Sequence, residues 1–178
     1  MKTLALQVIS ALALAVLIFF GVQSTIESRV VEGSSMESTL HDDQRLLVVK
    51  AAYWFGEPQR GDVVVFMHPL DTERALVKRV IGLPGEQVEI TGGIVYINDS
   101  PLEEPYINDQ SLTSCTGSYC SLTIPEGEFF VMGDNRFYSS DSRSWGTIPD
   151  GNIVGKVWLI YWPLDDWHVV QGYSYSLD

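Results

Sequence analysis

The stretch QVEITGGIVYI, residues 87–97, sets the fold class of this chain. Both of its ends are rich in Val and Ile, residue types that favour strands. Gly92 and Gly93 separate the two runs by two residues, and a Gly-Gly connection of that length is a strong hairpin signal. Residues 98–101 combine Asn, Asp, Ser and Pro and indicate the next turn. The stretch therefore predicts an antiparallel β-hairpin.

Runs of the same kind recur on both sides of this hairpin. They are rich in Val, Ile, Phe and Tyr, and Gly or Pro punctuates them. No segment after the N-terminal apolar stretch has a helical period over a dozen residues. We therefore predict a mainly β fold behind one N-terminal helix. The predicted strands cover residues 45–50, 62–66, 76–81, 87–91, 94–97, 129–132 and 154–161.

The length of 178 residues fits one domain with a small satellite. Three parts are predicted along it. Residues 1–24 form a cytoplasmic stub and a transmembrane anchor. Residues 25–81 and 124–178 form the β core, and residues 82–123 form a smaller β lobe inserted in that core.

The anchor prediction rests on residues 4–22, which carry no charge and only Gln7 and Ser10 as polar interruptions. As a helix this stretch spans roughly 28 Å, close to the ~30 Å hydrocarbon thickness of a bilayer. A cleaved secretory signal is the alternative, because Lys2 supplies a short positive region. The apolar run is long for such a signal, however, and residues 21–25 offer no A-x-A-like cleavage site. Lys2 and the free N-terminus favour a cytoplasmic N-terminus, with the remainder outside.

The net charge of −12 excludes nucleic acid as an expected partner, since an acidic protein surface repels the phosphate backbone. It also indicates that any membrane contact beyond the anchor is apolar, although an acidic surface is equally typical of a soluble body. Cys115 and Cys120 are close in sequence and predict a loop disulfide in an oxidising compartment. Two cysteines with no nearby His are too few for structural zinc, so no metal site is expected.

Residues 53–55 are three consecutive aromatics, Tyr-Trp-Phe. Side chains alternate along a strand, so a continuous triplet cannot all face one side. Core packing is the default in a β protein, while Trp and Tyr also favour a membrane interface. The sequence leaves these two interpretations open.

Ser35 is the candidate nucleophile. Gly33 and Ser34 before it are small, as a backbone must be where a substrate carbonyl approaches a serine hydroxyl and an amide N–H. Serine needs a base, and none of the three histidines lies in a recognisable triad context. Ser-rich turns are also commonly structural, so this segment alone indicates little.

Lys78 is the better candidate for that base. It lies in the strand-like run 76–81, where Leu76 and Lys78 share one face. If that face is buried, desolvation lowers the lysine pKa and makes a neutral amine available; an edge-strand lysine with a solvated head is the alternative. Residues 133–143 hold mixed charges that can pair and pin a loop, and serine hydroxyls that can hold a buried amine. A solvated polar loop is the plain alternative there.

Taken together, these residues resemble the type I signal peptidases, a family of membrane-anchored Ser-Lys proteases. The resemblance covers nearly the whole chain. It is carried by four blocks in order: residues 33–40, residues 60–66 with Pro69, residues 78–85 and residues 133–143.

The family resemblance implies a mainly β fold with a coiled-sheet, barrel-like catalytic core and a smaller β lobe. It implies that Ser35 is the nucleophile and Lys78 the general base of a serine endopeptidase. The implied supporting residues are Ser139, which orients the Lys78 amine, Gly33, and two ion pairs, Arg79–Asp134 and Asp141–Arg143.

The implied activity is removal of N-terminal signal peptides from exported preproteins, without a cofactor. Small residues at −1 and −3 would be held as an extended strand. The implied location is the bacterial inner membrane, with the bilayer as a partner, the secretion translocon nearby and the catalytic domain on the outer, periplasmic side. The implied shallow apolar pocket is formed by Val31, Met36, Leu40, Leu76 and Val77.

Two positions depart from the usual family pattern. Ser38 stands where a proline is usual, which predicts a looser loop. Gly33 stands where some members place an oxyanion-hole serine, so only backbone donors, chiefly the Ser35 N–H, are expected there.

Three other functions stay open from the sequence. A self-cleaving Ser-Lys regulator would need a DNA-binding helical domain where this chain has an apolar segment. A catalytically silent, membrane-tethered β scaffold and a specialised peptidase for one pilin or conjugation protein are the remaining alternatives.

Overall fold

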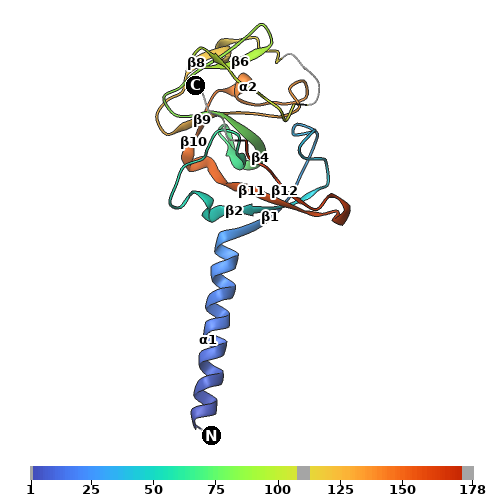
Figure 1. The fold of residues 1–178 in the computed structure, drawn as a ribbon. Helices are drawn as coiled ribbons and strands as arrows, with labels where there is room; N and C mark the ends of the chain where they lie inside the picture. Colours follow the sequence, from blue (N-terminus) through green and yellow to red (C-terminus); the bar gives the residue numbers. More distant parts are fainter. Residues whose placement is uncertain (1, 108–112, 174–178) are drawn as a thin grey trace.

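The computed structural model describes residues 2–107 and 113–173. The N-terminal helix α1 (Lys2–Thr25) projects from a β body as a single rod (Figure 1). Its segment Leu6–Thr25 has a mean hydropathy of 2.2, and none of that segment is buried. A helix that is apolar on every side and packs on no core is suited to lipid, and this one is long enough to cross a bilayer.

The larger sheet has eight strands, and all its neighbouring strands are antiparallel. The strand order is β1-β2-β11-β3-β4-β9-β10, and β12 pairs with β11. The central strand β4 has its C-terminal half between β3 and β9, which makes that half a buried part of the body. The strands are β1 (Ile26–Val30), β2 (Arg45–Val49), β3 (Val63–His68), β4 (Asp71–Gly82), β9 (Glu128–Met132), β10 (Ile148–Pro149), β11 (Ile153–Trp162) and β12 (His168–Val169).

The smaller sheet is formed by the chain between β4 and β9, in the order β7-β6-β5-β8. Its strands are β5 (Gln87–Thr91), β6 (Ile94–Ile97), β7 (Ser100–Pro101) and β8 (Ser121–Thr123). The predicted hairpin is present, since Thr91 pairs with Ile94 across Gly92 and Gly93. Both glycines have positive φ, +58° and +86°, which side chains rarely adopt and which this tight turn requires.

The helices of the β body are short. They are the 3₁₀ turns η1 (Lys50–Tyr53), η2 (Ser118–Cys120), η3 (Asp150–Asn152) and η4 (Leu164–Asp166), and the single-turn helix α2 (Ser142–Trp145). The predicted fold class, mainly β behind one N-terminal helix, is confirmed. Within the described residues no strand pairing joins β1 to β10, so the larger sheet is not a closed barrel.

In the aromatic triplet 53–55, one residue packs in the core and the other two are exposed. Tyr53 packs against a buried cluster of the larger sheet and donates its hydroxyl to Asp62 at 2.9 Å. Trp54 and Phe55 are 56% and 98% exposed. The turn η1 contacts α1, so these two rings lie on the part of the body that meets the helix.

The core fixes the loop that follows β1. Met36 and Leu40 are almost completely buried in the same cluster as Val48 of β2 and Val63 of β3. Burying a side chain of this size stabilises by about 1.5–3 kcal/mol relative to exposure. Two buried side chains therefore hold the segment 33–40, hereafter the serine loop, against the larger sheet.

Candidate active site

The structure brings Ser35 of the serine loop beside Lys78 of β4. The Lys78 Nζ donates to the Ser35 Oγ at 2.7 Å and to the Val77 carbonyl at 2.9 Å. Lys78 is only 3% exposed, because it lies in the half of β4 that β3 covers. The side chain therefore points inward, not to solvent as an edge-strand lysine would.

Burial changes the chemistry of this amine. The pKa of Lys78 is lowered from 10.5 to about 8, chiefly by desolvation; the Arg74 cation also lowers it, while Asp141 and Asp134 oppose the shift. At pH 7 a pKa near 8 leaves about one amine in ten neutral, against roughly 0.03% for an ordinary lysine. A neutral amine within hydrogen-bond reach of a hydroxyl can act as its general base.

Hydrogen bonds within the serine loop shape the turn around Ser35. The Glu37 N–H donates to the Ser34 carbonyl at 3.1 Å, and the Leu40 N–H donates to the Met36 carbonyl at 2.8 Å. Gly33 adopts φ +87°, and its N–H donates to Asp42 Oδ1 at 2.6 Å. The loop therefore leaves β1 through a position that favours glycine.

Ser38 also has a positive φ, +90°, which is strained for a residue with a side chain. Its hydroxyl donates to the Tyr106 carbonyl at 2.7 Å. The Tyr106 ring in turn lies 4.1 Å from the Arg79 guanidinium carbon. The loop predicted to be loose at Ser38 is thus tied to the segment after β7.

The predicted pair Arg79–Asp134 is present and completely buried. Arg79 Nε and Nη2 donate to the two Asp134 oxygens at 2.9 and 2.7 Å. Thr39 Oγ1 donates to Asp134 at 2.5 Å and accepts from Arg79 at 3.1 Å. Removing one partner of such a buried pair typically costs about 3–5 kcal/mol. The pair joins the strand of the lysine, the serine loop and the segment after β9.

Residues 133–143 supply the other wall of the site. The Asn135 N–H donates to the Ser35 carbonyl at 3.1 Å, and Asn135 Nδ2 donates to the Ser34 carbonyl at 3.0 Å. Gly133 approaches so closely that a Cβ there would overlap the Ser35 carbonyl oxygen and the Ser139 side chain. Only glycine therefore fits at position 133 without displacing the serine loop.

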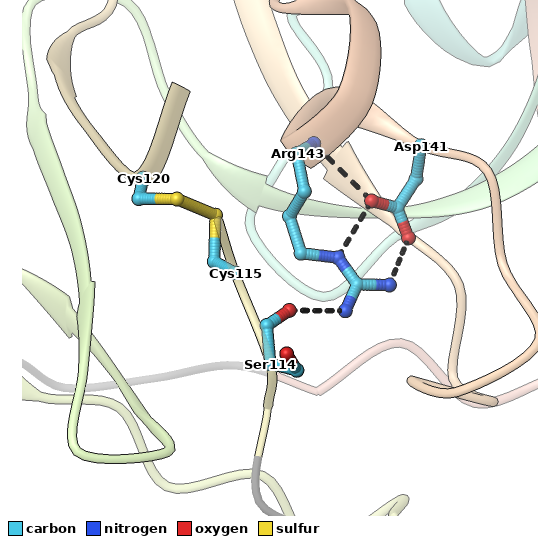
Figure 2. The surroundings of a disulfide bond; sticks show 5 residues. All are labelled: Ser114, Cys115, Cys120, Asp141 and Arg143. Atoms are coloured by element: carbon cyan, nitrogen blue, oxygen red, sulfur yellow. Dashed lines mark hydrogen bonds and ion pairs between the residues drawn. A yellow bond between two sulfur atoms is a disulfide. The ribbon is translucent and has the colours of Figure 1, made fainter. Parts of the chain in front are cut away.

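The predicted pair Asp141–Arg143 is also present, with two contacts of 2.8 Å. Asp141 caps α2 through the Arg143 N–H and accepts the Gly133 N–H at 3.1 Å. Burial would raise the pKa of Asp141, but Arg143 outweighs burial and the net pKa is lowered. Figure 2 shows that Arg143 Nη1 also donates to the Ser114 carbonyl, at 3.0 Å.

The predicted disulfide joins Cys115 to Cys120 directly after Ser114 (Figure 2). The disulfide is confirmed, and it helps to hold the site, because Ser114 directly before it accepts a hydrogen bond from Arg143. The disulfide loop lies in the chain between β4 and β9, which also forms the smaller sheet, so that part of the chain contacts the site through both Tyr106 and Ser114.

Ser139 lies beside Gly133, and its hydroxyl is buried. It lies close enough to the Asp141 carboxylate to help lower the pKa of that group, and no hydrogen bond joins it to Lys78 among the described residues. The predicted role of Ser139 in orienting the Lys78 amine stays a prediction.

A cavity of about 500 Å³ opens in front of Ser35 and Lys78. Four of the five predicted pocket residues line it: Val31, Met36, Leu76 and Val77. Leu40 does not, because it is fully buried in the core behind the loop. The rim carries charges that the sequence did not single out, among them Arg29, Glu32, Glu73 and Arg74.

Three further residues escaped prediction as individuals. Thr39 and Asn135 lie inside the blocks that carry the family resemblance. Their polar side chains close to predicted ion-pair residues were the signal that could have identified them. Tyr106 gave no signal, since its contacts with the site, to Ser38 and Arg79, come from residues 27 or more positions away in sequence.

Comparisons with known proteins agree over most of the chain. The profile of the family described as signal peptidase, peptidase S26, matches residues 2–162. Signal peptidase I of Leptolyngbya laminosa is 39% identical over 166 residues, which cover 88% of this chain and 79% of that protein. Signal peptidase I U of Bacillus subtilis is 38% identical over 172 residues, covering 93% of this chain and 91% of that protein.

A crystal structure of a signal peptidase I from Enterococcus faecalis is 35% identical, with a TM-score of 0.49, and covers 56% of this chain and 96% of that chain. Signal peptidase IB of Staphylococcus aureus is 36% identical over 93% of this chain and 94% of that protein. The profile match and the identities across nearly whole relatives establish that this chain belongs to the signal peptidase family, peptidase S26.

Proposed function

We propose that this serine endopeptidase removes signal peptides with Ser35 as nucleophile and Lys78 as general base. The observation that carries the proposal is the 2.7 Å contact between a nearly fully buried lysine amine and the Ser35 hydroxyl. A lowered lysine pKa and a serine at the mouth of a cavity are what a Ser-Lys dyad needs.

The proposed reaction has two steps. Neutral Lys78 takes the proton of Ser35 while Oγ attacks the scissile carbonyl, and backbone N–H groups, chiefly that of Ser35, hold the oxyanion. Protonated Lys78 then gives its proton to the leaving amine. Water, activated by the same amine, hydrolyses the acyl-enzyme. Ser139 is proposed to hold the Lys78 amine once the substrate occupies the site.

Substrate selection is proposed to come from the cavity of about 500 Å³. Its apolar lining of Val31, Met36, Leu76 and Val77 favours small side chains at −1 and −3. The substrate would lie extended, with alternate side chains directed into the cavity.

We propose that α1 anchors the protein in the bacterial inner membrane, with the β body on the outer, periplasmic side and near the translocon. Trp54 and Phe55 would then contact the bilayer, because they are exposed beside the turn that meets α1. The division into a core of residues 25–81 and 124–178 and a lobe of residues 82–123 is part of the proposal. The two sheets support that division.

The test uses the full chain in detergent with a purified preprotein. Ser35→Ala and Lys78→Ala should each abolish cleavage while far-ultraviolet circular dichroism stays unchanged. Substantial cleavage by either folded variant would eliminate the dyad. Absence of any cleavage by the wild type, together with no reaction with a serine-acylating penem, would favour the scaffold function.

The substrate range calls for a second experiment. Depletion in the source cell, followed by a survey of exported precursors, should show many uncleaved species if the enzyme has a general role. Accumulation of one pilin-like or conjugation precursor would instead favour the specialised peptidase.

A further inference from the structure

We infer that a second cavity, across the serine loop from the first, receives the start of the mature polypeptide, and that Glu37 there selects against acidic residues. The inference rests on the proposed function, since it assumes that Ser35 is the nucleophile. It extends that function to the part of the substrate that leaves as the first product.

The second cavity has a volume of about 490 Å³. It shares no lining residue with the first cavity, and the serine loop divides them. Ser35 and Met36 line the first cavity, whereas Glu37 and Ser38 line the second. Asn135 also lines the second cavity, and its N–H donates to the Ser35 carbonyl at 3.1 Å. The second cavity therefore begins one hydrogen bond from the nucleophile.

The path of the substrate follows from the order of its residues. The residues before the scissile bond occupy the first cavity and stay there in the acyl-enzyme. The residues after that bond must leave Ser35 away from the first cavity. We place them in the second cavity, because it adjoins Ser35 through Asn135 and lies on the other residues of the serine loop. Two residues of chain span at most about 7 Å, and an extended substrate advances about 3.3 Å per residue. Glu37 is thus within reach of the second or third residue after the cut.

The charges that line this cavity are not equivalent. Asp134 is completely buried against Arg79, and the buried Arg136 pairs with Glu104 at 2.5 Å. Glu37 is exposed, and its carboxylate makes no ion pair or hydrogen bond within the described residues. One unpaired carboxylate thus faces the passing chain and would attract basic side chains and repel acidic ones.

The expected effect is modest because the contact is solvent-exposed. A single exposed ion pair changes an equilibrium by about two- to fivefold, and a like-charge contact acts in the opposite sense. We expect kcat/KM to favour Lys over Glu at the second or third mature position by about five- to tenfold. The preference should shrink at 1 M salt, where the Debye length is only about 3 Å.

The test compares two peptide substrates, identical up to the cut, that carry Lys or Glu at the second and third positions after it. Full-length wild type in detergent should prefer the Lys peptide, Glu37→Gln should lose the preference, and Glu37→Lys should reverse it. Glu126→Gln is the matched control, because it removes one exposed carboxylate from the loop before β9. It should keep the wild-type preference.

A serine-acylating penem separates this inference from the proposed function, because it brings no polypeptide into the second cavity. Wild type and both Glu37 variants should react with it at equal rates. A wild type that is acylated but cleaves the Lys and Glu peptides equally would overturn the inference and leave the dyad intact. A wild type that is not acylated would overturn the dyad itself. If Glu37→Gln reacted with the penem at a different rate, Glu37 would act by shaping the serine loop, and the inference would be overturned.

Discussion

The proposed dyad predicts how acylation of Ser35 depends on pH, because burial lowers the pKa of Lys78. With a pKa of about 8, the neutral fraction of the amine rises from roughly 9% at pH 7 to 50% at pH 8 and about 91% at pH 9. Acylation should therefore increase about fivefold from pH 7 to 8 and less than twofold from pH 8 to 9. A solvated lysine with a pKa of 10.5 would instead give about tenfold for each unit over this whole range.

The direction of a further shift can be tested through Arg74. Its cation disfavours protonation of Lys78, whereas Asp141 and Asp134 favour it. Arg74→Ala should therefore move the midpoint of the pH profile upward. Arg29→Ala removes another cation from the lining of the same cavity and should leave the midpoint in place, because Arg29 is not among the charges that shift the Lys78 pKa.

The assay is the rate of covalent labelling by a fluorescent penem between pH 6 and 10, in detergent, with the intact fraction followed on a gel. A penem carries no ionisable leaving polypeptide, so the profile reports the enzyme. A profile that climbs tenfold per unit to pH 10 would refute the burial argument. A flat profile would refute a titrating base altogether.

Three other predictions concern the support of the dyad. Ser38→Gly should keep the unfolding midpoint close to wild type, because glycine accepts φ +90°. The same variant should slow acylation about two- to tenfold, because it loses the hydrogen bond to Tyr106. Ser38→Ala should lower both the unfolding midpoint and the acylation rate. Gly133→Ala should cost about 1–3 kcal/mol of unfolding free energy and at least tenfold in acylation, whereas Gly151→Ala, which meets no atom within 4 Å, should cost little in either measurement. Lys78→Met should abolish acylation yet raise the free energy of unfolding at pH 7 by up to about 3 kcal/mol, measured by urea denaturation. A pKa of about 8 instead of 10.5 means that folding disfavours the charged amine, and this cost is fully present below pH 8.

Sequence patterns predicted most of the strands because their signal is local. Val- and Ile-rich runs between glycines and prolines specified β2, β3, β5, β6, β9 and β11, and the hairpin turn was specified by two glycines. Five strands were missed, and β4 was predicted too short. Four of the missed strands, β7, β8, β10 and β12, are only two or three residues long, and the fifth is β1. The strand β1 contains Glu27, Ser28 and Arg29, and β4 begins at Asp71 with a polar segment. Polar residues on exposed strands resemble turns when only the sequence is considered.

The site was predictable only through its ordered blocks. No local pattern distinguishes an inward Lys78 from a surface one, since its burial comes from β3 and from the serine loop 43 residues away. Leu40 was expected in the pocket because apolar character alone does not separate a pocket wall from the core behind it. Ser38 and Tyr106 are 68 residues apart in sequence, and their contact depends on a positive φ at Ser38. A serine in a sequence gives no sign of a positive φ, so this contact could not be predicted.

The most direct test of the dyad is to map the acylated residue. Wild-type protein labelled with a penem at pH 8 should yield one modified peptide by mass spectrometry, with the adduct on Ser35. Lys78→Ala should remain folded and give less than about one hundredth of that labelling, because the proposed general base is gone. An adduct on another serine, or undiminished labelling of Ser35 in Lys78→Ala, would contradict the proposal that these two residues carry the reaction.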